Sequence, residues 1–184
     1  ILLAFPNTYF ADLNSKGKFD NLESVTKEVK LMMDPNVNPF AAPAVDESAV
    51  PAKFGASDVQ DLNWVQLLNA YTCTECGRCT SSCPANLTGK KLSPRKIMMN
   101  TRDRLEEVGR NIDSNKGVFV PDNKSLLNDY ITPEELWACT SCNACVEECP
   151  VNISPLSIIM DMRRYLVMEQ SAAPMSLNAM MTNI

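Results

Sequence analysis

Eight cysteines carry most of the chemistry that this sequence of 184 residues offers, and all of them lie in two short runs. Both runs follow the pattern C-x-x-C-x-x-C-x-x-x-C-P, and their cysteines are Cys73, Cys76, Cys79, Cys83, Cys139, Cys142, Cys145 and Cys149. Four thiolates in this spacing are typical ligands of a [4Fe–4S] cluster, because a cubane takes one sulfur ligand at each iron. The two runs therefore predict two [4Fe–4S] clusters and a role in electron transfer.

The spacing also predicts which cysteines share a cluster. Gaps of two residues let one tight loop present three sulfurs to the same cluster, whereas the gap of three is close to one helical turn, so the fourth cysteine points elsewhere. In this pattern the fourth thiolate binds the other cluster. We therefore assign cluster 1 to Cys73, Cys76, Cys79 and Cys149, and cluster 2 to Cys139, Cys142, Cys145 and Cys83.

Two other interpretations of the cysteines are weaker. Disulfide scaffolds are small and rich in cysteine throughout, while these cysteines form two tight groups in a longer chain. Zinc sites use pairs of C-x-x-C knuckles that supply two ligands each, and they have no use for a third cysteine and a fourth that precedes proline. The iron–sulfur interpretation fits every position of the pattern.

The composition excludes several other functions. With 22 acidic and 17 basic residues the formal net charge is −5, so nucleic acid is not an expected partner. The chain has no histidine, which removes imidazole ligation of haem, Rieske-type clusters and the commonest general base, and we predict no catalytic residue. No stretch approaches the ~18 apolar residues of a membrane span. Free thiols kept for metal indicate a reducing compartment, with the cytoplasm as the default.

The sequence around the two cysteine runs is duplicated. Residues 70–74 align with 136–140, residues 84–87 with 150–153, and Arg102 with Arg163. Each copy contains a Ser-Pro pair after its cysteines, which predicts a helix with serine as the N-cap and proline at the first helical position. Each copy thus predicts a helix, a cysteine loop, a short helix and a long helix, and a pseudo-twofold axis between the copies explains the exchange of the fourth cysteine.

Helical periodicity and caps predict an all-α fold. We expect helices over residues 58–71, from 94 toward 108 with Gly109 weakening or ending the helix, and from 155 to about 170. Thr132 begins a capping box that leads into another helix. The predicted division is an N-terminal extension, residues 1–57, and a two-cluster domain, residues 58–184. The extension should hold a short amphipathic helix at about 21–33 and a proline-rich, extended connector over 34–57.

The two cysteine runs inside a helical frame resemble the α-helical ferredoxin domain of heterodisulfide-reductase-like bacterial iron–sulfur oxidoreductases. The phrases at residues 71–79, YTCTECGRC, and 137–145, WACTSCNAC, carry this resemblance. It implies an electron-transfer segment of a larger membrane-associated oxidoreductase, with a cytochrome-like membrane portion and CCG domains as possible neighbours. It further implies a place at the cytoplasmic face of the inner membrane.

Two other functions stay open at this point. A free-standing soluble dicluster ferredoxin would carry the same clusters, and so would an iron–sulfur sensor or structural metal module. The chain does not start with methionine, and we interpret it as a segment of a longer polypeptide. Arg78 stands in the first loop where Ala144 stands in the second, which predicts a higher reduction potential for cluster 1.

Overall fold

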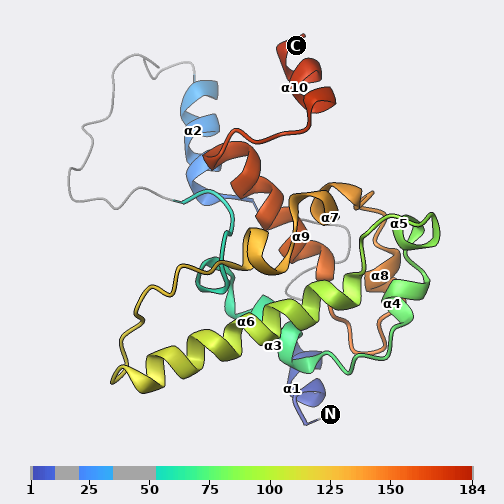
Figure 1. Cartoon of the computed structure of the whole chain (residues 1–184). Coiled ribbons are helices and arrows are strands. Elements are labelled where there is room, and N and C mark those ends of the chain that lie inside the picture. The colour runs from blue at the N-terminus through green and yellow to red at the C-terminus, as the bar shows by residue number, and fades with distance from the viewer. Residues whose placement is uncertain (1, 11–20, 35–52, 184) are drawn as a thin grey trace.

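The computed structural model describes residues 2–10, 21–34 and 53–183, and within these ranges the chain is helical and forms no strand (Figure 1). The predicted all-α fold is confirmed. Two short helices precede the cysteine loops: α1 (Ala4–Phe10), which we did not predict, and α2 (Glu23–Met33), which confirms the predicted N-terminal helix. Most of the predicted connector, residues 35–52, lies outside the described residues.

The first copy begins with a broken helix. A 3₁₀ turn, η2 (Val59–Asp61), is capped by Asp58, and α3 (Trp64–Thr72) then starts afresh from Asn63. The continuous helix predicted over residues 58–71 is therefore wrong in its first part. The reason is local: Asp58 and Asn63 each form a capping box, and two caps within six residues favour two helix starts over one continuous helix.

Three helices complete the first copy: α4 (Arg78–Ser81), α5 (Pro84–Leu87) and the long α6 (Pro94–Ser114). Gly109, which we expected to weaken or end this helix, does not end it. Val108 is buried and Ile112 packs against the core, so apolar contacts on both sides of the glycine offset its cost of about 1 kcal/mol. The Ser93 side chain accepts a hydrogen bond from the Lys96 N–H, which confirms the predicted cap.

The second copy repeats this order with one omission. It contains α7 (Pro133–Ala138), α8 (Ala144–Glu147) and α9 (Pro155–Arg164), followed by a wider helical turn, η4 (Tyr165–Glu169), and by α10 (Met175–Thr182). A turn stands where α5 stands in the first copy, and α8 is the short helix predicted between the cysteine loop and the long helix. The capping box at Thr132 and the cap at Ser154 are confirmed.

Residues 53–57 pack against the second copy, beside the wider turn η4. The Ala56 N–H donates to the Asp161 carbonyl at 3.0 Å, and the Phe54 N–H donates to Glu169 Oε1 at 2.7 Å. Gly55 lies so close to α9 that an added Cβ would come within 2.3 Å of the Asp161 carbonyl oxygen. The Asp161 carbonyl thus accepts from Ala56 as well as from Tyr165 of its own helix, at the point where α9 passes into η4.

The long helices of the two copies pack together and place the cysteine loops at one end. Helix α6 contacts α9, and α4 lies beside α8 (Figure 1). Residues of both copies share one core, among them Leu92, Ile97, Met98, Leu136, Ile158 and Ile159. In the described ranges no helix is long and apolar enough to cross a membrane.

A buried arginine joins the loop between the copies to the start of the domain. Arg104 on α6 is fully buried and donates to Asp58 Oδ2 at 2.7 Å and to Asp122 Oδ1 at 3.0 Å. These hydrogen bonds raise the pKa of Arg104 and lower the pKa of Asp122 to about 2. A buried charge with this many partners holds both segments against the same turn of α6.

The wide turn η3 (Leu126–Tyr130) belongs to this loop. Its residues Leu126 and Leu127 are buried in the core, and Asn128 has φ = 79°, in the left-handed region. The Asn100 amide donates to the Tyr130 carbonyl at 2.6 Å. The turn is therefore pinned against the middle of α6, which fixes where α7 and the second cysteine loop begin.

Candidate iron–sulfur site

The two cysteine loops have the same backbone conformation. Glu75 and Ser141, each two residues after the first cysteine, have φ = 57° and 56°, and Gly77 and Asn143 have φ = 81° and 61°. The left-handed conformation suits glycine and asparagine, so Gly77 makes a tight turn in the first loop and Asn143 makes the same turn in the second. The helices α4 and α8 follow at equivalent positions and carry the third cysteine of each loop. The duplication predicted from the sequence is thus present in the backbone.

A cavity lies between the first loop and the end of the second. Its wall contains Cys73, Cys76, Cys79 and Cys149, the four cysteines assigned to cluster 1, with Cys145 beside them. The rest of the wall is partly apolar, with Met98, Pro150, Val151, Ile153 and Pro155, and partly polar, with Thr74, Glu75, Gly77 and Arg95. Cys76 is exposed to solvent. The apolar part of the wall limits the access of water to a group bound by the thiols.

The thiols of the two runs lie close enough to interact electrostatically across the copies. Cys149 acts on Cys73 and Cys79, and Cys83 acts on Cys139 and Cys145. Each fourth cysteine thus faces the first and third cysteines of the other copy. The two groups are also neighbours, because Cys79 acts on Cys145.

Burial raises the pKa of the thiols in both groups. It does so for Cys73, Cys79 and Cys139, and it raises the pKa of Cys145 to about 12, where the neighbouring cysteines add to the effect. Thiols that repel each other's ionised forms need positive charge between them to become thiolates. Iron ions in a cluster would provide that charge.

Backbone N–H groups already point at the sulfurs. The Ser141 N–H donates to Cys139 Sγ at 3.4 Å, and the Glu75 N–H makes the equivalent hydrogen bond to Cys73. The Ile153 N–H donates to Cys149 Sγ at 3.4 Å. Donors of this kind stabilise thiolate ligands and tune the potential of the group they hold.

The donor set fits a cubane. No three or more His, Cys, Asp or Glu side chains in residues 2–10, 21–34 and 53–183 are gathered tightly enough to hold a single metal ion. A cubane takes a wider ligand set than one ion, because each thiolate binds a different iron. All eight cysteines are free thiols, and they lie in the two groups described above.

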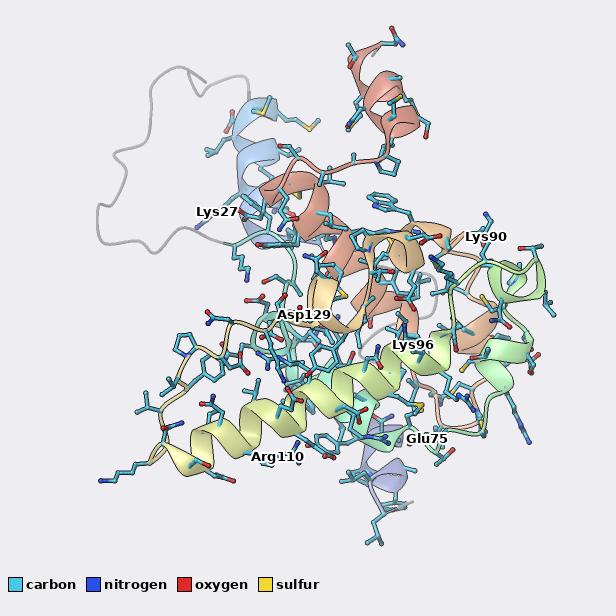
Figure 2. The ribbon with its side chains drawn as sticks, in the orientation of Figure 1. Lys27, Glu75, Lys90, Lys96, Arg110 and Asp129 are labelled. Atoms are coloured by element: carbon cyan, nitrogen blue, oxygen red, sulfur yellow. The ribbon has the colours of Figure 1, made fainter. Side chains whose placement is uncertain are left out.

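An arginine on the long helix of each copy reaches the loop of the same copy. Arg102 on α6 pairs with Glu75 at 2.7 Å, and Figure 2 shows Glu75 on the loop that passes α6. Arg163 on α9 lies 3.5 Å from the hydroxyl of Ser141, the residue equivalent to Glu75. The sequence aligned these arginines, but it did not indicate their partners.

A buried asparagine of α1 was also missed. Asn7 is fully buried and donates through Nδ2 to the Val151 carbonyl at 3.3 Å, next to the cavity wall. The isolated heptapeptide that forms α1 has no periodicity that points to this contact. Only the fold brings residue 7 to the segment that follows Cys149.

The fold and the cysteine groups define a dicluster iron–sulfur protein, and comparison with known families agrees. Residues 72–153 match the family model of the 4Fe-4S dicluster domain. The chain therefore contains a 4Fe-4S dicluster domain that holds two [4Fe–4S] clusters and acts in electron transfer. No solved structure matches the chain significantly.

Curated relatives of the chain include iron–sulfur oxidoreductases and a heterodisulfide reductase subunit, in agreement with the resemblance seen in the sequence. A probable iron-sulfur-binding oxidoreductase, FadF, of Bacillus subtilis is 32% identical over all of this chain and 27% of its own length. The EtfAB:quinone oxidoreductase of Syntrophomonas wolfei is 34% identical over 71% of this chain and 21% of its own length. One subunit of a ferredoxin/F420H2-dependent CoB-CoM heterodisulfide reductase of Methanosarcina acetivorans is 32% identical over 58% of this chain and 52% of its own length. The chain thus spans about a quarter of the first two relatives.

Proposed function

We propose that this segment relays electrons between two redox sites of a larger, membrane-associated oxidoreductase. The observation that carries the proposal is the cavity wall in which Cys145 and Cys149 of the second run lie with the three loop cysteines of the first run, because it brings the two clusters side by side. When bound, each [4Fe–4S] cluster accepts and releases one electron. The chain's own residues hold the clusters, line them with apolar side chains and aim N–H groups at their ligands.

The ligand assignment is part of this proposal. Cluster 1 takes Cys73, Cys76, Cys79 and Cys149, and cluster 2 takes Cys139, Cys142, Cys145 and Cys83. Two features support it: the common wall that contains all four cysteines of cluster 1, and the interactions of Cys83 with Cys139 and Cys145. Exchange of the fourth ligand ties the two copies together through both clusters.

The partners are redox domains or subunits of the same complex. Relatives support this, since two of them are called a quinone oxidoreductase and a heterodisulfide reductase subunit, and another, 36% identical, is called a probable membrane-anchored ferredoxin of Chromohalobacter salexigens. We propose a cytochrome-like membrane portion and CCG domains as neighbours and the cytoplasmic face of the inner membrane as the location. A free soluble carrier and a metal sensor are less well supported, because the relatives that cover most of the chain are far longer than a single ferredoxin.

Metal analysis and EPR of the anaerobically purified full-length protein test the proposal. About eight irons and eight sulfides are expected for each chain, and the reduced protein should give spectra of two magnetically coupled S = 1/2 centres. Rapid mixing with the physiological acceptor should then re-oxidise both centres within the turnover time. Two zinc ions in place of iron, or clusters that no partner oxidises, would exclude an electron relay.

A further inference from the structure

The two loops differ in the charge that lies beside them. Arg102 in the first copy forms an ion pair with Glu75 at 2.7 Å, and its Nε lies 3.6 Å from Asp103 Oδ1. Two carboxylates thus cancel the positive charge of this arginine. Since Glu75 is itself a residue of the first loop, the net charge that the pair presents to cluster 1 is close to zero.

Arg163, the equivalent residue of the second copy, has neutral partners instead. Its Nε and Nη2 donate to the Leu136 carbonyl at 3.0 and 2.6 Å, and Nη2 also donates to the carbonyl of Cys139, a predicted ligand. Its guanidinium lies over the Trp137 ring, 5.0 Å from the ring centre. Within residues 53–183, no carboxylate forms an ion pair with it. Glu75 neutralises Arg102 with a carboxylate, whereas Ser141, at the equivalent position, offers Arg163 a neutral hydroxyl.

Partial burial strengthens the effect of the Arg163 charge on neighbouring groups. Arg163 is half-buried, and desolvation lowers its pKa, although the nearby Cys139 thiol opposes that effect. Arginine stays protonated in proteins, so the charge remains in place. A charge in a poorly solvated position acts more strongly on its neighbours than one in water, and it is screened less by salt.

We propose that Arg163 makes cluster 2 the more easily reduced of the two clusters, so that an electron passes from cluster 1 to cluster 2. The reason is electrostatic: adding an electron makes a cluster more negative, and an unpaired cation beside it stabilises that state. This proposal rests on the proposed relay function. Arg163 would thus act on cluster 2 through its positive charge, next to the predicted ligand Cys139, without binding the cluster itself.

Exposed charges act in the opposite direction, but weakly. Arg78 and Arg95 lie by the first loop, where Arg95 also lines the cavity of cluster 1, and Glu147 and Glu148 follow the third cysteine of the second loop; all four are exposed. They would raise the potential of cluster 1 relative to cluster 2, as the sequence predicted from Arg78. Water and salt screen such charges, whereas the half-buried Arg163 keeps its effect. Added salt should therefore increase the potential difference between the clusters.

Arg163 also has a structural role, which the experiment must separate. Its bonds to the Leu136 and Cys139 carbonyls satisfy the end of α7, where a cation is favourable. Arg163→Lys keeps the charge but loses the fork-shaped set of donors, while Arg163→Met keeps the volume but loses the charge. If the charge of Arg163 sets the potential, only Arg163→Met should change it. If the capping hydrogen bonds set it, Arg163→Lys and Arg163→Met should change it alike.

Redox titrations monitored by EPR on the anaerobically purified full-length protein test the proposal. In Arg163→Met the reduction equilibrium of cluster 2 should fall about tenfold, equal to 59 mV for one electron, with cluster 1 little changed. Arg163→Lys should stay near wild type. The matched control is the double variant Arg102→Met/Glu75→Gln, which removes a cation and an anion together and should leave cluster 1 near its wild-type potential. Cys142→Ser assigns the signals, because it alters a predicted ligand of cluster 2 only.

Three results would overturn the proposal. The first is a reduction potential of cluster 2 that does not change in Arg163→Met. The second is an equal fall of this potential in Arg163→Lys and Arg163→Met. The third is a higher reduction potential for cluster 1 than for cluster 2 in the wild-type protein at high salt. None of these results affects the relay function itself. That function fails separately if the wild-type protein holds fewer than two clusters.

Discussion

The two cysteine loops share a backbone and differ in electrostatics. Glu75 and Ser141 have almost the same φ, and the third and fourth cysteines sit at equivalent places in both copies. Yet one loop carries a carboxylate paired with an arginine, while the other leaves the equivalent arginine among carbonyl groups. Backbone geometry decides whether a cubane can be held, so it is common to both copies. The surrounding charge decides the potential, and there the copies differ.

The long helices differ in a second way. Helix α6 runs for 21 residues, whereas α9 runs for 10 before it widens into η4. Residues 53–57 hydrogen-bond to α9 and η4 on either side of this change. A segment before the first copy thus stabilises the second copy, and the pseudo-symmetry ends at this contact.

The largest expected effect tests the exchange of ligands between the copies. Cys76→Ala/Cys149→Ala removes two ligands of cluster 1, so about four irons should remain. Cys76→Ala/Cys83→Ala removes one ligand from each cluster, and nearly all iron should be lost. Iron and sulfide analysis with EPR measures both. If each run held its own cluster, the two double variants would give the reverse result.

The next effect concerns the contact between residue 55 and α9. In Gly55→Ala the new Cβ would come within 2.3 Å of the Asp161 carbonyl oxygen and 2.5 Å of the Tyr165 nitrogen, at φ = 80°. We expect a loss of about 3 kcal/mol in the free energy of unfolding, because backbone atoms on both sides must move. Thermal unfolding of the cluster-loaded protein, followed by circular dichroism, measures it.

Gly89→Ala is the matched control for that variant. Gly89 has φ = 79°, but an added Cβ would meet nothing within 4 Å. Only the cost of the left-handed backbone remains, about 1 kcal/mol. Equal losses in the two variants would show that the approach of Gly55 to α9 contributes nothing.

A smaller difference is expected between the two serine caps. Both Ser93 and Ser154 accept a hydrogen bond from the backbone of their helix, and either serine-to-alanine change should cost about 1 kcal/mol. Ser93 also shares a 3.0 Å hydrogen bond with the Thr80 hydroxyl, which ties α6 to α4. Ser93→Ala should therefore destabilise the protein more than Ser154→Ala in the same unfolding measurement. A larger loss of stability in Ser154→Ala than in Ser93→Ala would mean that the hydrogen bond to Thr80 does not stabilise the protein.

The sequence predicted what local spacing determines. The cysteine runs, the Ser-Pro caps and the capping box at Thr132 all act within a few residues, and their structures agree with the prediction. The spacing of the cysteines also indicated the site. The four cysteines assigned to cluster 1 line the same cavity.

The errors arise where distant segments meet. The contact of Ala56 with Asp161 joins residues more than a hundred positions apart in the chain, and no pattern within α9 indicates it. The continuation of α6 past Gly109 depends on the core that Val108 and Ile112 join. The partners of Arg102 and Arg163 depend on how each long helix packs against its loop. Division of the chain at residue 58 stays a prediction, although residues 53–57 contact α9.

The smallest effect that we predict is a dependence of stability on pH, at a contact that joins the copies. Lys96 of α6 donates to Glu135 Oε1 of α7 at 2.6 Å, and Figure 2 shows Lys96 on α6. Glu135 is nearly buried, and burial alone would raise its pKa, but the hydrogen bonds from Lys96 and Thr132 more than offset this and lower it below 4.5. The ionised form is thus favoured in the folded protein. Its contribution is fully present above pH 4.5 and is lost as the pH falls through the lower pKa of the folded state.

Glu135→Gln should remove this part of the pH dependence. The amide keeps the shape of the side chain and can still accept from the Thr132 N–H, but it does not titrate. Lys96 is half exposed, so the charged contact should be worth less than about 1 kcal/mol. Stability curves of the metal-free protein between pH 6 and 3.5 should converge for wild type and variant at the acid end, because protonated Glu135 resembles glutamine. Glu134→Gln is the control, since Glu134 pairs with Lys91 in an exposed position and its removal should leave the slope unchanged. Parallel curves for Glu135→Gln and wild type would show that the Lys96 contact does not link the copies.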